Sequence, residues 1–338
     1  MTPRERVIAA LPDGVDGVFL ESAEAVSWYL GGARTSVPLG GPSVVTVLVR
    51  RDGDELRCHV MEAERLRDEE GVGDVVEVDW AQPLIPDHWR RDPGVRSEHQ
   101  LEGALRAARA SLSEAETARY RGLGAEVAES VTVVASGARP ERSEREVAGQ
   151  LADALYSIGA EPVVLLVAGS NRLGYRHPLP TAAALGERAM IVVGARRQGL
   201  VVNLTRWVGF DAVEPVANGR LRAVEADVLD ATVPGAAFAD VFRALVASYA
   251  ANGFDPLEWR RHHQGGPTGY FGRDPKVTPT TSGAVAERQA FAWNPSAPGG
   301  KTEDTVIATS TGIELLTHDP SWPSVIVNGR PRPLTLQL

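Results

Sequence analysis

The order of helices and strands in the second part of the chain is the feature that most limits its fold. Long segments rich in Ala, Leu, Glu and Arg predict helices first, and apolar, β-branched runs then predict strands with two more helices among them. The expected helices span 98–112, 113–137, 143–159, 213–235 and 236–253, and the expected strands span 161–169, 188–199, 200–210, 284–295, 302–312 and 313–318. Ser113 with Glu116 and Ser143 with Glu146 predict capping boxes at two of these helices, and Gln198-Gly199 predicts a hairpin turn. Helices followed by a mostly antiparallel sheet predict a mixed α+β domain.

The first part of the chain predicts a smaller domain of alternating short strands and helices. A β-branched run at 44–51 is followed by Asp52-Gly53, a hairpin turn signal, and by a partner strand at 55–62. The segment 81–96 is rich in Pro and irregular, which favours a domain boundary there. Because 338 residues exceed the usual size of one domain, we expect two, spanning 1–98 and 99–338.

Charge and composition narrow the function classes. The net charge of -9 argues against a nucleic-acid partner, since nucleic-acid binders usually carry a basic stripe. No apolar run reaches the ~18 residues of a membrane helix, and the N-terminal segment lacks a secretory apolar region. The lone Cys58 excludes an internal disulfide framework. We therefore expect a soluble, cytoplasmic protein without a nucleic-acid or membrane partner.

Four motifs occur in an order and spacing that resemble the creatinase/aminopeptidase P/methionine aminopeptidase family. They are GSNRLGYRHPLPT, IVVGARRQGLVVNLTRWVGF, HHQGGPTGY and NPSAPGGKTEDTVI. The resemblance covers about residues 100–320 and extends more loosely to the N-terminal domain. It implies a small N-terminal α/β domain with a ribonuclease-H-like sheet, a C-terminal pita-bread domain with a curved antiparallel sheet, and a homodimer.

The resemblance also implies which residues stand at the metal-ligand positions. Peptidases of this family hold two metal ions with Asp, Asp, His, Glu and Glu. Val192, Asn203, Gly266, Asn294 and Glu303 occupy the corresponding positions of this chain. Valine and glycine side chains offer no donor atom, and one carboxylate cannot hold two divalent ions. We therefore expect no dinuclear metal site and no cofactor.

A histidine suited to proton transfer remains. The family has a His shortly before a Pro-Thr step, and His177 stands there in this chain. In creatinase, the metal-free branch, the matching His is the catalytic base and acid, and imidazole titrates near neutral pH. Two readings stay open: His177 is catalytic, or it only caps a loop. Glu303 would orient or protonate His177, or bind a cationic group of the substrate.

The loop GYFGRD resembles creatinase in placing an arginine near the site. Arg273 would grip a substrate carboxylate in a bidentate manner, or would only pair with Asp274 or Glu303. Arg34 would enter the partner chain's site, as the resemblance implies, or would be an exposed loop arginine. The other expected substrate-binding residues are His263, preferred over His262, and Tyr270, Asn203, Asn294 and Lys301, the last with the alternative of pairing with Glu303.

These residues lead to three function hypotheses. The first is a metal-independent, creatinase-like enzyme that hydrolyses or eliminates at a C–N bond of a small, anionic nitrogen compound. The second is a catalytically inactive pseudo-peptidase that binds a peptide, a protein or a metabolite. The third is a single-metal aminopeptidase that would use Glu303, His177 and Asn294, and it is the least favoured because that ligand set is unusual.

Overall fold

The computed structural model describes all residues 1–338 and divides into two compact units. The first unit contains Met1–Ser111 and Gln198–Leu200, and the second contains Leu112–Arg197 and Val201–Leu338. The chain therefore passes between the units later than the boundary expected at residue 98. The physical reason is that the segment after 98 packs against the N-terminal helix, where the Arg6 guanidinium donates to the Ser111 carbonyl over 2.7 Å.

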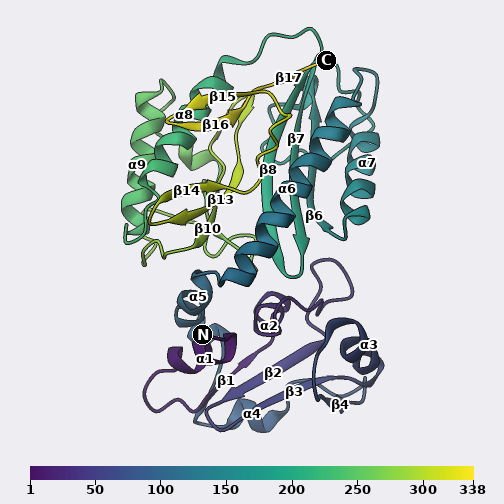
Figure 1. Ribbon diagram of the computed structural model, residues 1–338, viewed down its shortest axis with the longest axis vertical. Helices are drawn as coiled ribbons and strands as arrows, with labels where there is room; N and C mark the ends of the chain where they lie inside the picture. Colours follow the sequence, from purple (N-terminus) through teal and green to yellow (C-terminus); the bar gives the residue numbers. More distant parts are fainter. The chain divides into compact units, whose positions relative to one another are not determined.

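The N-terminal unit is built on a five-stranded mixed sheet with the order β4-β3-β2-β1-β5 (Figure 1). Its strands are β1 (Gly17–Leu20), β2 (Val45–Arg50), β3 (Asp54–His59), β4 (Val76–Val78) and β5 (Val95–Ser97), and its helices are α1 (Pro3–Ala10), α2 (Ala23–Tyr29), α3 (Val60–Glu70), α4 (Asp87–Arg91), η1 (Glu98–Leu101) and α5 (Glu102–Ala110). The Pro-rich segment 81–96 is not a linker, because it supplies α4 and the edge strand β5, which pairs parallel with β1.

The second unit opens with two helices and a long hairpin. Helices α6 (Glu114–Ser136) and α7 (Glu144–Ser157) both begin with the capping boxes that Ser113 and Ser143 predict. Strands β6 (Glu161–Gly169), β7 (Arg188–Arg197) and β8 (Leu200–Gly209) form a sheet with the C-terminal strand β17 (Leu336–Gln337). The predicted turn is confirmed, since Gln198 and Gly199 have φ of 48° and 76°, as a tight hairpin requires.

A second sheet of the same unit, with the order β14-β13-β10-β9, packs against the remaining long helices. The helices are α8 (Val216–Ala231) and α9 (Phe238–Ala251), and the strands are β9 (Gly265–Thr268), β10 (Gln289–Trp293), β13 (Asp304–Thr309) and β14 (Gly312–Leu315). Short pieces complete the unit: η2 (Ser170–Arg172), η3 (Glu258–Arg261), β11 (Ser296–Ala297), β12 (Gly300–Lys301), β15 (Ser324–Val327) and β16 (Arg330–Pro333). The predicted mixed α+β class is confirmed, whereas β9, β11, β12 and β15–β17 were not predicted because they are short or polar.

No helix combines the length and the apolar character that crossing a membrane would need.

Candidate functional site

The motif residues of the C-terminal unit meet around one cavity of about 200 Å³. Strands β6, β7 and β8 form one wall, and the segments around β9, β10 and β12 form the other. The lining residues are Val164, Leu166, His177, Val192, Val193, Asn203, His263, Gly272, Arg273, Lys276, Asn294, Lys301 and Glu303. Of the predicted site residues, the structure brings together His177, Asn203, His263, Arg273, Asn294, Lys301 and Glu303.

Glu303 is the only carboxylate on the cavity wall, and two cations hold it. Its Oε2 atom lies 3.1 Å from the Lys301 ammonium, and its Oε1 atom accepts from the Arg273 guanidinium. Burial alone would raise the pKa of Glu303, but the charges of Lys301 and Arg273 hold it below the ordinary value. Burial lowers the pKa of Lys301, and Glu303 opposes that effect.

These contacts decide between the readings that the sequence left open. Arg273 pairs with Glu303, and so does Lys301, so neither cation is uncommitted. Glu303 makes no hydrogen bond to His177, because both of its oxygens already face cations. The role expected for Glu303 in orienting His177 is therefore absent from this geometry, and Glu303 acts on the cavity through charge.

Three imidazoles lie close together, and those of His177 and His263 line the cavity. The Nε2 atoms of His177 and His262 are 2.9 Å apart, and the ring of His263 stacks on His262 with centroids 4.3 Å apart. Burial lowers the pKa of His177, with Lys301 adding to the effect. Burial lowers the pKa of His263 to about 4, and that of His262 to about 2. All three rings are therefore neutral at neutral pH.

Four of the five positions at which the resemblance implies metal ligands carry neutral groups. Val192 offers no donor atom, while the Asn203 Nδ2 atom and the Asn294 Oδ1 atom are buried without a hydrogen-bond partner. The position expected for the ligand histidine, Gly266, does not line the cavity. A Cβ added there would meet the Pro275 carbonyl oxygen at 2.7 Å, so this position faces its own loop. The imidazole on the cavity wall is that of His263.

This donor set does not fit the two metal ions that the fold family implies. A dinuclear site needs several anionic oxygen ligands. Here the one carboxylate is already neutralised by an ammonium and a guanidinium, and the two amides beside it carry no charge. Two divalent cations in this cavity would also be repelled by the positive charges of Lys301 and Arg273.

Two predicted site residues lie away from the cavity. The Tyr270 hydroxyl donates to Glu116 and accepts from Arg119, each over 3.1 Å, so it ties the loop to α6. In the N-terminal unit, the Arg34 Nε atom donates to Glu70 over 2.5 Å, and its Nη2 atom lies 3.3 Å from Glu69. The entry of Arg34 into a partner chain's site stays a prediction.

Sequence reasoning missed Lys276. Its side chain is exposed, lines the cavity and forms no ion pair, in contrast to Lys301 and Arg273. No motif marked it, because it lies beyond the end of the GYFGRD loop in sequence. The contact between His262 and His177 was also missed, because 85 residues separate them.

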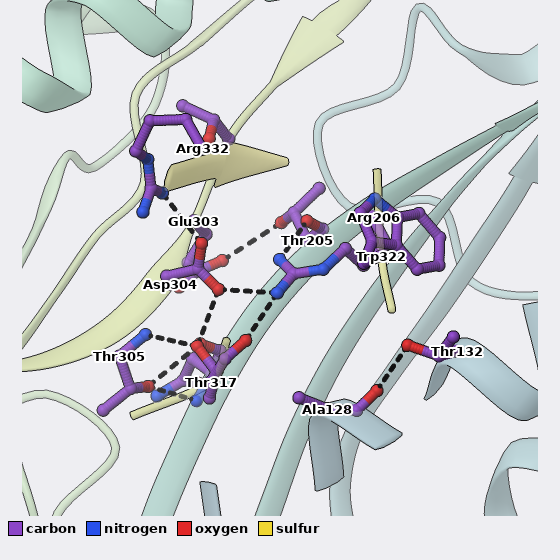
Figure 2. Close-up of polar contacts among 12 residues, drawn as sticks. Ala128, Thr132, Thr205, Arg206, Glu303, Asp304, Thr305, Thr317, Trp322 and Arg332 are labelled. Carbon is purple, nitrogen blue, oxygen red and sulfur yellow. Dashed lines mark hydrogen bonds and ion pairs between the residues drawn. The ribbon is translucent and has the colours of Figure 1, made fainter. Parts of the chain in front are cut away.

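Directly after Glu303, Asp304 anchors the start of β13 from the opposite side. It accepts from Arg206 over 2.9 Å and from the Thr317 hydroxyl over 2.7 Å, and its other oxygen lies 2.8 Å from Arg332 (Figure 2). Arg332 also pairs with the buried Glu225. These contacts hold the β13 backbone beside β8, where Thr205 donates its amide to the Glu303 carbonyl over 2.9 Å.

No protein-family model and no curated protein matches this chain. Solved structures do match over nearly its whole length. The prolidase from Pyrococcus horikoshii OT3 is 17% identical with a TM-score of 0.73, covering 94% of this chain and 98% of that one. The dipeptidase PepE from Mycobacterium ulcerans is 18% identical with a TM-score of 0.75, covering 99% and 96%. The N-terminal domain of the FACT complex subunit SPT16 from Cicer arietinum (chickpea) is 14% identical with a TM-score of 0.68, covering 94% and 96%.

These likenesses confirm the fold that the four motifs predicted. The chain has the pita-bread architecture of prolidases and related dipeptidases, preceded by an N-terminal domain. The same fold occurs in structures named as peptidases and in a subunit of a complex, so the fold alone does not decide between an enzyme and a binding protein. The function has to be argued from the cavity.

Proposed function

We propose that the protein is a metal-independent, creatinase-like enzyme that breaks a C–N bond in a small, carboxylate-bearing nitrogen compound. The observation that carries this proposal is the combination of uncommitted polar groups on one cavity, Lys276, the Asn203 amide donor and the Asn294 amide acceptor, with the His177 imidazole beside them. A decayed site that had only lost its metals would more simply have filled with apolar side chains.

The cations of the cavity favour an anionic ligand. The cavity is lined by three cations and by only one carboxylate, that of Glu303, so its wall carries excess positive charge. The cations are Arg273, Lys276 and Lys301. Lys276 is the one cation among them without an ion pair, and it is available to a substrate carboxylate. The buried Asn203 Nδ2 atom would donate to an oxygen of the same ligand.

The Asn294 amide oxygen, just after β10, favours a ligand that also carries N–H groups. The Asn294 Oδ1 atom is buried without a partner, and a buried acceptor left unpaired costs about 1–3 kcal/mol. An amine, amide or guanidino N–H would satisfy it. A cavity of about 200 Å³ limits the ligand to a small molecule.

His177 would move the proton. Because burial and Lys301 lower its pKa, the ring is neutral at neutral pH and serves as a base. It would take a proton from water or from a substrate C–H, and return it to the leaving nitrogen. Hydrolysis and elimination use the same proton transfers, so both remain within the proposal.

The test begins with ligand discovery. Protein in EDTA is screened by thermal shift against small N-substituted amino acids, guanidino acids, betaines and dipeptides. Hits are then assayed for turnover with the wild type, with His177→Ala and with His99→Ala, an exposed histidine of the N-terminal unit as the matched control. We expect EDTA to leave turnover intact, and His177→Ala to lower it by about 10²–10⁴-fold with folding preserved. Full activity in His177→Ala would remove this residue from the mechanism.

The alternative is a catalytically inactive protein that binds a peptide, a protein or a metabolite. The likeness to the SPT16 domain is the observation that favours it, since that structure is named as a complex subunit. A thermal-shift hit that is never converted would support this alternative. The homodimer and the cytoplasmic location also stay predictions, and sedimentation analysis tests the former.

A further inference from the structure

We propose that His177, His262 and His263 form a second, independent site for one borderline divalent cation such as Zn²⁺. Three imidazoles are a familiar ligand set for zinc, with the fourth position left open. Two of the three, His177 and His263, line the cavity, and the trio uses none of the five family ligand positions. The site is therefore distinct from the dinuclear centre that this chain has lost.

The geometry is close to what a tetrahedral zinc ion needs. The candidate ligand nitrogens of the three rings all lie within 4.8 Å of one another. With Zn–N bonds of about 2.0–2.1 Å, tetrahedral ligand nitrogens are about 3.4 Å apart. The two Nε2 atoms of His177 and His262 are 2.9 Å apart, so small rotations of the rings reach the required spacing.

The rings have nitrogens that no protein group has claimed. The Nδ1 atoms of His262 and His263 are buried and lack any hydrogen-bond partner. Buried polar atoms are normally paired, so two neighbouring exceptions point to a missing ligand. At His263 a cation would take the Nδ1 lone pair that is otherwise unused, whereas at His262 it would bind Nε2 in place of the hydrogen bond to His177.

The surrounding charge sets the class of cation. The trio includes no carboxylate, which disfavours Mg²⁺ and Ca²⁺ and favours Zn²⁺, Cu²⁺, Ni²⁺ or Co²⁺. Three of the nearby cations are partly neutralised, since Lys301 and Arg273 pair with Glu303 and Arg176 pairs with Glu258, whereas Lys276 is unpaired and weakens binding. No carboxylate accepts a hydrogen bond from the ring nitrogens that would not bind the metal. We therefore expect micromolar affinity and not the nanomolar affinity of a structural site.

The consequence of binding would be inhibition. A cation on His177 takes the lone pair that the proposed catalysis needs. This consequence rests on the proposed function, whereas the binding itself does not. Zinc would thus act as a reversible inhibitor of an enzyme that needs no metal, and EDTA would restore turnover.

The test measures binding directly and needs no substrate. Chelator-treated protein is titrated with Zn²⁺ by calorimetry, and in parallel with Co²⁺ by visible absorption. We expect one ion per chain and the strong d–d bands of tetrahedral Co²⁺. His262→Ala and His263→Ala should each weaken binding at least tenfold, while His99→Ala, which removes an exposed histidine elsewhere, should not.

Two results would overturn the inference. One is binding to the wild type that His262→Ala and His263→Ala leave unchanged, which would place the metal elsewhere. The other is a wild-type Co²⁺ spectrum with only the weak bands of the octahedral aqua ion, a reading that does not depend on whether a variant folds. Turnover in EDTA is assayed separately, so failure of this site and failure of the proposed catalysis give different results.

Discussion

Glu303 and Asp304 are consecutive residues, and each is a buried carboxylate held by two cations, yet their surroundings differ. Asp304 lies among Arg206, Arg332 and Thr317, with Arg332 fully buried and also paired with Glu225 (Figure 2). Glu303 holds Lys301 and Arg273 on the wall of a cavity of about 200 Å³. The two side chains lie on opposite sides of the same strand start.

The difference shows that a buried ion network does not by itself mark a functional site. The Asp304 network connects β8, β13, β16 and α8, and its charged groups pair with one another, while the Arg332 Nε and Nη1 atoms are buried without a hydrogen-bond partner. The Glu303 cluster is smaller, but around it lie an unpaired Lys276, two amide groups without partners and neutral imidazoles. A cavity lined by uncommitted groups, and not buried charge, distinguishes the candidate site from the structural network.

The largest expected effect comes from breaking the structural network. Arg332→Met leaves Glu225 without its guanidinium partner and removes one of the two cations at Asp304. Removing one partner from a buried network of this kind costs about 3–5 kcal/mol of unfolding free energy. Urea denaturation monitored by circular dichroism measures this loss of unfolding free energy. Arg243→Ala is the control, because Arg243 forms only an exposed ion pair with Asp240.

The matched change on the cavity side sharpens the contrast. Arg273→Met removes the guanidinium from one carboxylate oxygen of Glu303 and leaves Lys301 paired with the other. The cavity beside Glu303 has room for water to solvate the oxygen that loses its partner. We therefore expect a clearly smaller loss of stability than in Arg332→Met. Equal losses in the two variants would contradict the division into a structural network and a functional cluster.

A second contrast is in pH dependence, because only the cavity side carries histidines. The folded-state pKa values of His262 and His263 are about 2 and about 4, below the ordinary value, so the unfolded chain binds protons that the folded chain excludes. The contribution of these two histidines to the unfolding free energy is therefore fully present above about pH 6.5. It is lost as the pH decreases, by up to about 1.4 kcal/mol per pH unit for each histidine.

The window from about pH 6.5 to 5 isolates this effect, since most carboxylates titrate below it. Unfolding free energies measured across the window should fall in the wild type and fall less in His262→Asn. His99→Asn, at an exposed position, should keep the wild-type slope. A wild-type stability that does not change between pH 6.5 and 5 would show that the folded chain accepts these protons.

The sequence predicted the fold because its signals were local and repeated. Capping boxes at Ser113 and Ser143, the Gln198-Gly199 turn and the order of four motifs each indicated the same domain, and the structure confirms them. The N-terminal boundary was less accurate, since a Pro-rich segment resembles a linker even where it forms an edge strand. Short strands such as β16 depend on tertiary pairing and carry no strong pattern of their own.

The candidate site was predictable in membership but not in pairing. The motifs identified Asn203, Asn294 and Glu303, which all line the same cavity. The sequence offered the pairing of Arg273 and of Lys301 with Glu303 only as alternatives to substrate binding, and the fold shows that both pairs form. The assignment of the ligand-histidine position to Gly266 likewise followed motif spacing, whereas the structure turns that position toward Pro275.

The smallest expected effect concerns Lys276, and it tests the functional half of the comparison most directly. Lys276→Ala removes an exposed, unpaired cation, so we expect a change in unfolding free energy within about 0.5 kcal/mol. Affinity for an anionic ligand should fall a few-fold, in line with about 0.2–1 kcal/mol for an exposed ion pair. Lys276→Arg should retain binding, and the loss in Lys276→Ala should shrink at high salt because salt screens exposed charges. Unchanged affinity in Lys276→Ala at low salt would show that the ligand's charge is met by Arg273 or Lys301, and Glu303 would then have to release one of them on binding.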